Sequence, residues 1–199
     1  MDDVATTQHN GEMTERLTRE FFARDPVVVA RALIGTVMVV AHRDEPLRAH
    51  ITETEAYAGA RDPASHAFRG PTPRTQIMFG PAGFVYVYKS YGIHWCMNIV
   101  TGPPGVASAV LLRGALALEG DSPLAIMNGP GLLTRTLEIT GGDNGVDVCQ
   151  EPPGRIYFLS RAHGERWRVG QSTRIGISKA TDLPWRFFSE KVPTSRDST

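Results

Sequence analysis

Apolar and polar residues alternate through the first half of the chain, which predicts β-strands. The segment LRAHITETEAY, residues 47–57, alternates with a period of two, and the apolar run TVMVVAH at 36–42 precedes it across the turn-like RDEP. Two further runs, at 84–88 and 94–100, predict a β-hairpin whose tip lies near residues 89–92. We therefore expect neighbouring strands to pair antiparallel.

The second half of the chain continues this pattern. GVASAVLLRGALALEG, residues 105–120, predicts another strand that ends around Arg113. We expect RIYFLSR at 155–161 and STRIGISK at 172–179 to complete the sheet, and PWRFF at 184–188 to fold back onto the body. Because strands outnumber helices and most are joined as hairpins, the pattern predicts an α+β domain with an antiparallel or mixed sheet.

Helices and one long loop separate these strands. Residues 17–35 predict two helices, the first capped by Thr18 and the second starting at Pro26. PGLLTRTLEI, at 130–139, predicts a short helix introduced by its proline. The loop at 59–83 contains several Gly and Pro residues and is too long for a simple connection, so we expect it to carry function.

A length of 199 residues fits one domain without internal repeats. The polar, acidic residues 1–13 are expected to be a disordered tail, residues 14–190 the folded domain, and residues 191–199 a C-terminal tail. No run of about 18 apolar residues is present, and the N-terminus lacks the apolar core of a signal peptide. We therefore expect a cytoplasmic, nucleoid-associated if bacterial, protein that does not enter a membrane.

Cysteine and histidine usage gives no support for a disulfide or a metal site. Cys96 and Cys149 are expected to be separate thiols, and the six histidines show no metal-ligand spacing. The net charge is zero, which argues against a nucleic-acid partner, yet residues 155–179 hold five Arg and one Lys against Glu165 alone. That cluster fits a solvated surface and a nucleic-acid contact equally well.

The strand at 47–57 carries two acids and a phenol on one face. Side chains alternate across a strand, so Glu53, Glu55 and Tyr57 lie on the same side, about 6.5–7 Å apart. Two acids at this spacing can act as acid and base in glycoside hydrolysis. They also fit a solvated strand face, which is the commoner fate of such a pattern.

The hairpin presents tyrosines in two settings. Tyr86 and Tyr88 point to one side of their strand, which is typical of core packing, whereas Tyr91 lies at the tip beside a glycine and cannot bury itself. Exposed apolar groups of this kind are used as wedges between DNA bases, and Lys89 beside it can hold a phosphate. On the return strand, Asn98 needs hydrogen-bond partners or a ligand if it faces the interior.

Three long segments carry a resemblance to a known family. They read ETEAYAGARDPASHAFRGPTPR, MFGPAGFVYVYKSYGIHWCMNIV and VLLRGALALEG. Together they resemble the alkyladenine (3-methyladenine) DNA glycosylase family of the kind without a helix–hairpin–helix motif. The similarity extends from FFARDPVVVARALIG to STRIGISKATDLPWRFF, nearly the whole chain outside the termini. Two positions depart from the family pattern: Leu132 stands where a lysine is common, and Thr75 where an asparagine is frequent.

The resemblance implies which residues act on the base and on its glycosidic bond. Glu55 matches the general base that activates the hydrolytic water, and Arg113 matches an arginine near that water and the target phosphate. Tyr57, His66 and Tyr88 match the aromatic walls that stack on a flipped base. Stacking returns on the order of 1–3 kcal/mol per base, which offsets the few kcal/mol that extrusion costs.

The resemblance also implies contacts with the rest of the DNA. Tyr91 matches the intercalating tyrosine that takes the place of the extruded nucleotide. Asn98 matches the pocket asparagine that excludes guanine by crowding its exocyclic amine. Backbone contacts are expected from Lys89 and Arg74, and from Arg135 in place of the missing lysine.

The family's fold is a single α+β domain with a curved antiparallel sheet, surrounding helices and a protruding hairpin. Its activity implies a monofunctional glycosylase that hydrolyses the N-glycosidic bond of alkylated or deaminated purines in duplex DNA, as a monomer and without cofactor or metal. No lysine is expected in the pocket, so Schiff-base strand cleavage is not expected. Two alternatives stay open: a non-catalytic damaged-DNA-binding module of the same fold, and a glycosidase that uses Glu53 and Glu55 as its acid pair.

Overall fold

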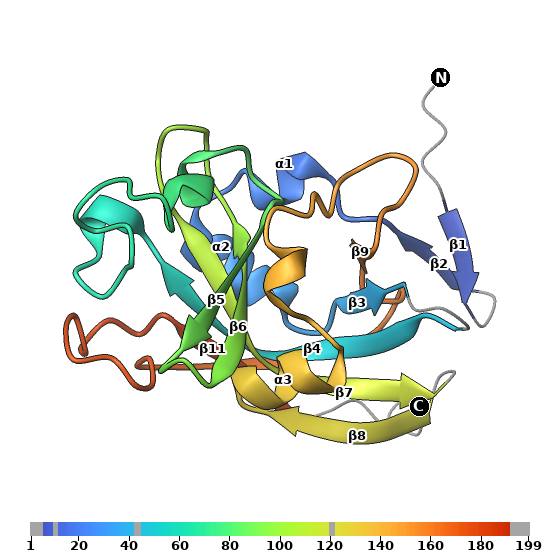
Figure 1. Cartoon of the computed structure of the whole chain (residues 1–199). Coiled ribbons are helices and arrows are strands. Elements are labelled where there is room, and N and C mark those ends of the chain that lie inside the picture. The colour runs from blue at the N-terminus through green and yellow to red at the C-terminus, as the bar shows by residue number, and fades with distance from the viewer. Residues whose placement is uncertain (1–5, 10–11, 42–44, 120–121, 192–199) are drawn as a thin grey trace.

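The computed structural model describes residues 6–9, 12–41, 45–119 and 122–191 (Figure 1). Its helices are α1 (Arg19–Phe22), α2 (Pro26–Leu33) and α3 (Pro130–Thr136), with 3₁₀ turns η1 (Gly59–Arg61), η2 (Gln76–Phe79) and η3 (Gly141–Asp143). Asp25 caps α2, because its carboxylate accepts a hydrogen bond of 2.9 Å from the Val27 amide. Thr18 occupies the N-cap of α1 as expected, but its side chain makes no capping hydrogen bond.

Strands form a curled antiparallel sheet that runs through the whole molecule. They are β3 (Val37–Val40), β4 (Leu47–Tyr57), β5 (Val85–Ser90), β6 (His94–Val100), β7 (Ala109–Glu119), β8 (Ser122–Asn128), β9 (Ile156–Leu159), β10 (Arg168–Ser172) and β11 (Arg186–Lys191). The order is β10-β11-β4-β7-β6-β5, with β3 between β4 and β9, and with β8 on β7. The expected α+β class and antiparallel sheet are confirmed.

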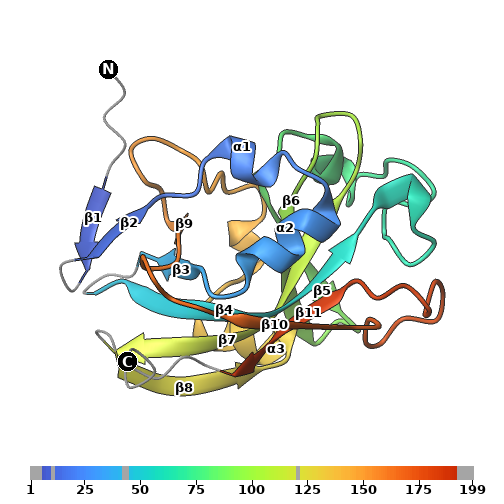
Figure 2. The ribbon, with the colours of Figure 1, turned by 180° about the vertical axis from the view of Figure 1, so that it is seen from behind.

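The apolar core lies on one face of this sheet, where α1 and α2 cover it (Figure 2). Ile51 and Ala56 of β4 and Leu112 of β7 point to this face and are fully buried. Thr54 also points inward, where its hydroxyl donates a hydrogen bond of 2.8 Å to the carbonyl of Ala30 in α2. We call the opposite side of the sheet its outer face.

Two bulges interrupt the ladder between β4 and β7. Ile51 pairs with Ala115, then Glu53 with Gly114, so Thr52 has no partner in the register. Thr54 then pairs with Leu112, so Arg113 of β7 likewise has no partner in the register. A bulge adds one residue that shifts the alternation of side chains. Both extra residues project to the outer face, which is how an arginine comes to lie beside the acids of β4.

The second half of the chain departs from the predicted elements in three places. The strand expected to end around Arg113 continues to Glu119, and β8 follows it as a hairpin partner that the sequence does not predict. STRIGISK was expected to be a strand, but only its first residue belongs to β10 and the remainder is loop. PWRFF, expected to fold back, contributes to β11, which lies inside the sheet between β10 and β4.

The N-terminal segment also differs from the expected disordered tail. Residues 6–9 and 12–15 form a separate antiparallel hairpin, β1 (Thr6–His9) with β2 (Glu12–Glu15). Residues 1–5, 10–11 and 192–199 lie outside the described residues, as does most of the expected C-terminal tail. Cys96 and Cys149 are both free, and burial raises the pKa of the Cys149 thiol to about 11. In the described part of the chain, no helix is long and apolar enough to cross a membrane.

Candidate active site

A cavity of about 670 Å³ opens on the outer face where several parts of the chain meet. These parts are the end of β4, the loop that follows it, the β5–β6 hairpin, β7, the start of α3 and the loop between β10 and β11 (Figure 1). Its wall contains eight residues that the sequence singles out: Tyr57, His66, Arg74, Tyr88, Lys89, Tyr91, Asn98 and Arg113. These segments are distant in sequence, so the fold brings the residues together.

Glu55 lies directly beneath the wall of this cavity and exposes none of its surface. Its Oε2 accepts a hydrogen bond of 2.8 Å from the Tyr57 hydroxyl, and its Oε1 accepts one of 2.7 Å from the backbone amide of Ile175. The Arg113 guanidinium is 3.4 Å from Oε1. All three partners line the cavity, so Glu55 is linked to the cavity wall through them.

The Tyr57 hydroxyl is a donor in this arrangement. Burial, with the Glu55 carboxylate beside it, raises the pKa of Tyr57 far above the ordinary value for a phenol. The hydroxyl therefore keeps its proton and points it at Glu55. Three donors from three different segments fix the orientation of one carboxylate.

Glu53 lies two residues earlier on the same face, in a different environment. Its Oε1 accepts hydrogen bonds from the Nε of Arg113 at 2.9 Å and from the Nε of Arg186 at 2.6 Å. Arg186 also donates to the hydroxyl of Ser172 at 2.9 Å. Both acids of β4 thus contact Arg113, and Glu53 holds that arginine in place.

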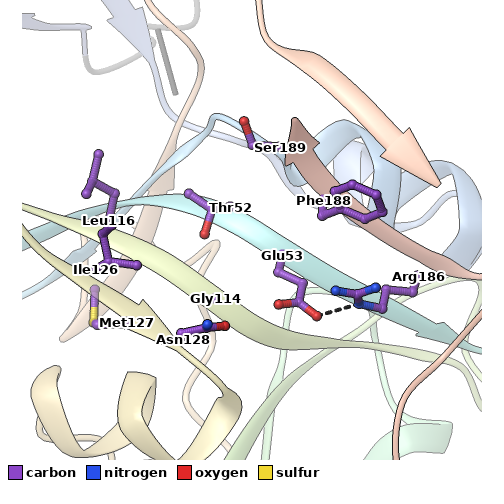
Figure 3. A pocket seen from close by; sticks show the side chains of 10 residues that line it. All are labelled: Thr52, Glu53, Gly114, Leu116, Ile126, Met127, Asn128, Arg186, Phe188 and Ser189. Carbon is purple, nitrogen blue, oxygen red and sulfur yellow. Dashed lines mark hydrogen bonds and ion pairs between the residues drawn. The ribbon is translucent and has the colours of Figure 1, made fainter. Parts of the chain in front are cut away.

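Glu53 faces a second, smaller cavity of about 300 Å³ (Figure 3). Its wall includes Thr52, Leu116, Ile126 and Phe188, and the Glu53–Arg186 ion pair crosses its floor. Phe188 is the one aromatic ring among its lining residues, and Glu53 and Arg186 bind one another. The two cavities therefore differ in composition.

Aromatic rings form one side of the larger cavity. The rings of His66 and Tyr88 meet edge to face with centroids 4.5 Å apart, and those of Tyr86 and Tyr88 lie 5.5 Å apart. The Arg74 guanidinium lies over the Tyr88 ring at 5.0 Å. Burial raises the pKa of Tyr88, so this phenol also stays neutral. The cavity can therefore accept a flat aromatic ligand against electron-rich faces.

Hydrogen bonds determine the protonation of His66. Tyr86 Oη accepts a hydrogen bond of 3.2 Å from Arg74 Nε and lies 3.1 Å from His66 Nδ1, to which it directs its own proton. Arg74 Nη2 approaches the same Nδ1 at 3.5 Å and can only donate. Nδ1 is thus the acceptor and Nε2 carries the proton. Burial and the Arg74 charge lower the pKa of His66, which keeps the ring neutral.

The loop that carries His66 is anchored to the hairpin by a small apolar cluster. Ala67 and Met78 pack against Tyr86 and Val100. Asn98 lies next to them on β6, almost fully buried, and donates a hydrogen bond of 3.1 Å to the carbonyl of Tyr86. This bond fixes the amide in the cavity wall and leaves its oxygen available to a ligand.

The hairpin tip projects Tyr91 into solvent at the rim of the cavity. The side chain is 91% exposed, and its backbone has φ of +50°, in the left-handed region that non-glycine residues rarely adopt. Its neighbour Ile93 is 70% exposed. Two exposed apolar side chains on one tight turn gain nothing from folding, so the turn is shaped for something that binds over it.

Lysines lie closer to the cavity than the sequence predicts. Lys89 and Lys179 both line it, so the expectation of a pocket without lysine is wrong. Lys89 lies over the Trp95 ring at 5.0 Å. Arg135 is exposed in the last turn of α3, outside the residues that line the cavity, and Leu132 packs against the core.

Half of the basic cluster at 155–179 makes contacts within the protein. Arg155 pairs with Asp143 at 2.6 Å, Arg174 pairs with Asp62 at 2.5 Å, and Arg161 donates to the carbonyl of Ala32. The other three basic residues, Arg166, Arg168 and Lys179, are exposed. Among the described residues, no group of three or more His, Cys, Asp or Glu side chains is arranged to hold a metal ion.

Comparison with known proteins identifies the family. The family model described as methylpurine-DNA glycosylase matches residues 20–193. The chain belongs to the methylpurine-DNA glycosylase family. It is therefore a DNA glycosylase, an enzyme of DNA repair, and the family resemblance noted in the sequence is confirmed.

Relatives from several bacteria match this glycosylase over most of its length. Proteins of Frankia casuarinae and Streptomyces avermitilis are both 43% identical, over 85% and 89% of this chain and 86% and 89% of their own. One from Rhodopseudomonas palustris is 44% identical over 86% of this chain and 83% of its own. All three carry the name 3-methyladenine DNA glycosylase as a provisional assignment.

Sequence reasoning misses three groups of this glycosylase's site. The backbone amide of Ile175 contacts Glu55, and an amide has no sequence signature. Arg174 belongs to the basic cluster and Arg186 to the segment expected to fold back onto the body. The pairing of β11 with β4 brings Arg186 beside Glu55, and a hydrogen bond to the Ala56 carbonyl holds Arg174 at the end of β4. The pattern RIGISK followed by PWRFF offers no periodicity from which their partners could be found.

Proposed function

We propose that this glycosylase is monofunctional: it flips an alkylated or deaminated purine out of duplex DNA and hydrolyses its N-glycosidic bond. The observation that carries the proposal is the position of Glu55 beneath a ring-walled cavity with Tyr91 exposed at its rim. An enzyme that acts on a base within a duplex must extrude that base. The cavity supplies a place for the base, and the tip supplies a group to fill the gap.

Glu55 is the general base in this scheme. A carboxylate has about four lone-pair sites, so Glu55 can accept a proton from water while it keeps its hydrogen bonds to Tyr57 and Ile175. The Nε of Arg113 lies 3.4 Å from Glu55 Oε1, so this arginine can bind the water or the phosphate of the target nucleotide. The negative charge also stabilises the positive sugar that forms as the bond breaks.

Stacking on the aromatic wall holds the flipped base. Tyr57, His66 and Tyr88 are neutral, and a positively charged methylpurine gains a cation–π contribution that a normal base lacks. Asn98, fixed by its bond to Tyr86, rejects guanine because its amide crowds the exocyclic amine. Selectivity thus combines a gain for damaged bases with a penalty for one normal base.

The rim of the cavity binds the DNA backbone. Lys89, Arg74 and Lys179 are exposed and surround the opening, which places three positive groups within reach of phosphates. Arg135 lies farther away and makes at most a peripheral contact. The enzyme acts as a monomer, because one cavity and one tip contain every group that the scheme uses, and it works where the chromosome is.

Base release from labelled duplexes tests this proposal. Native protein should release methylated purines or hypoxanthine and leave abasic sites that break only with alkali. Glu55→Gln should lower the single-turnover rate by about 10³-fold or more while duplex binding persists. Because Lys89 and Lys179 line the cavity, borohydride reduction during turnover should be included, and it should trap no protein–DNA adduct.

Two outcomes would contradict the proposal. Duplex binding without release of any damaged base by native protein would favour the non-catalytic binding module. A borohydride-trapped adduct that disappears in Lys89→Gln or Lys179→Gln would replace hydrolysis by Schiff-base chemistry. The third reading, a carboxylate pair of Glu53 and Glu55, is disfavoured because both close partners of Glu53 are arginines that already bind it.

A further inference from the structure

One buried ion pair joins the two loops on either side of the cavity. Arg174, at the start of the loop between β10 and β11, donates to both oxygens of Asp62, at 2.5 Å and 2.8 Å. Asp62 belongs to the loop that follows β4, and neither side chain exposes any surface. Figure 1 shows the two loops next to one another at the same end of the sheet. This forked geometry is specific to arginine.

Arg174 makes further contacts that a simple loop tether does not need. Its Nη1 also donates to the carbonyl of Ala56 at 2.9 Å, at the end of β4. Its guanidinium lies over the Tyr57 ring at 4.7 Å and over the Trp185 ring at 5.2 Å. Arg174 therefore contacts both the backbone just before Tyr57 and the ring of Tyr57, the residue whose hydroxyl donates to Glu55.

The residue after Arg174 is the one whose amide binds Glu55. Ile175 N–H donates to Oε1 at 2.7 Å, so any shift of Arg174 displaces this donor. Asp62 in turn accepts hydrogen bonds from the amides of Ala58 and Ala64, which fixes the loop leading to His66. One guanidinium thus determines two of the three donors around Glu55, although it does not contact that carboxylate itself.

We infer that Arg174, held by Asp62, is a positioning residue for the general base: it orients the Ile175 amide and the Tyr57 hydroxyl on Glu55. This inference rests on the proposed role of Glu55. A misplacement of about 1 Å in a catalytic group can lower a rate by about a hundredfold. Breaking the fork therefore affects the chemical step more than the binding of DNA, which takes place at the rim.

The test separates single-turnover base release from duplex affinity. Arg174→Lys keeps the charge and loses the fork, so its release rate should fall about ten- to a hundredfold, with duplex affinity changed less than about threefold. In a Glu55→Gln background the same change should have almost no further effect, because the group that it positions is already disabled. Asp62→Asn keeps the shape of the side chain, so its release rate should fall less. This variant replaces Arg174→Lys in the test if Arg174→Lys does not fold.

A matched control is available elsewhere in the chain. Arg155 pairs with Asp143 at 2.6 Å and donates to the carbonyls of Ala41 and Glu138, but lines neither cavity. Arg155→Lys should leave the release rate within about twofold of native. An Arg174→Lys rate that falls no further than this control, or that falls equally in the Glu55→Gln background, would overturn the inference.

Amide hydrogen exchange provides a readout that does not depend on activity. The Ile175 amide should exchange faster in Arg174→Lys than in native protein, while amides in β6 stay unchanged. Unchanged protection of Ile175 would refute the positioning role. If native protein releases no base, the proposed function fails, and this exchange measurement alone still decides whether Arg174 positions Ile175.

Discussion

Two carboxylates on the same strand face, two residues apart, occupy very different surroundings. Glu53 binds two arginines through one oxygen and faces a small cavity of mixed polar and apolar lining with a single aromatic ring, Phe188. Glu55 has a phenol and a backbone amide as its close donors and lies beneath a large cavity with aromatic walls. The residue type and the strand position are the same, so the neighbours decide which acid is free to take part in chemistry.

The difference has an energetic reason. Charged donors compensate the buried charge of Glu53 and fix it as a structural anion. Glu55 has two neutral donors at hydrogen-bond distance, with the Arg113 guanidinium farther away at 3.4 Å, so its carboxylate keeps capacity to accept a proton. The elements that pack over the strand, β11 and the loop before it, thus give the two acids different surroundings, and in the proposed function only Glu55 is reactive.

The largest expected effect on stability comes from neutralising each of the two acids in turn. Glu53→Gln leaves Arg113 and Arg186 facing a neutral amide, so we expect a loss of about 3 kcal/mol in the free energy of unfolding. In Glu55→Gln the amide oxygen can still accept from the Ile175 amide, and the Tyr57 hydroxyl must turn to accept from the new NH2 group, so we expect a smaller loss of about 1 kcal/mol together with the proposed loss of activity. Urea unfolding of both variants measures the contrast. Equal losses of stability would mean that the two sites do not differ as described.

Substitution of Tyr91 at the hairpin tip should lower DNA affinity and leave stability almost unchanged, in contrast to Glu53→Gln. Tyr91→Ala removes a side chain that is 91% exposed, so the unfolding free energy should change by less than about 0.5 kcal/mol. Affinity for a lesion-containing duplex should fall about tenfold, since a wedge or stacked ring contributes about 1–3 kcal/mol. Tyr91→Phe is the control and should bind like native protein. Loss of affinity in Tyr91→Phe would assign the effect to the hydroxyl.

Acid should weaken the aromatic wall through His66. The pKa of His66 is lowered from 6.5 in the folded protein, so the unfolded chain binds a proton more readily. Stability therefore falls as the pH drops below about 6.5, because burial and then the Arg74 charge disfavour the protonated ring. Thermal unfolding between pH 8 and pH 5 measures this slope, which should become shallower in His66→Phe. An identical slope in that variant would exclude His66 as its cause.

The smallest effect is expected in the small cavity. Ile126 is 74% exposed at its wall and contacts none of the charged groups. Ile126→Ser should change the unfolding free energy by less than about 0.5 kcal/mol and leave base release at the native rate. A clear fall in base release would show that both cavities contribute to the reaction, and the surroundings of Glu53 and Glu55 would then not differ in function.

Local patterns were sufficient to predict much of this fold. β4 and the β5–β6 hairpin follow from alternation, and α2 follows from the proline at its start. β8 escaped prediction because SPLAIMN contains a proline and its apolar residues do not alternate cleanly. β7 was expected to end too early, since a charged residue within an apolar run resembles the end of a strand.

The sequence predicts the parts of the candidate site that consist of characteristic side chains, but not those that depend on a backbone amide or on a long-range contact. Glu55, Tyr57 and the aromatic set stand in recognisable segments, and the fold places them around one cavity. The Ile175 donor and the Arg174–Asp62 pair depend on contacts between residues more than 100 positions apart. No short-range pattern specifies such contacts, because they are fixed only when the sheet closes.

The paired bulges place Arg113 beside the acids of β4 as an insertion in an otherwise complete ladder. If Thr52 and Arg113 were both removed, Ile51, Glu53 and Thr54 would still pair in sequence with Ala115, Gly114 and Leu112, and every side chain would keep its present face. The ladder therefore does not depend on the arginine that it carries. A chain without the two extra residues would keep the sheet and the Glu53–Arg186 ion pair, while Glu55 lost its charged neighbour.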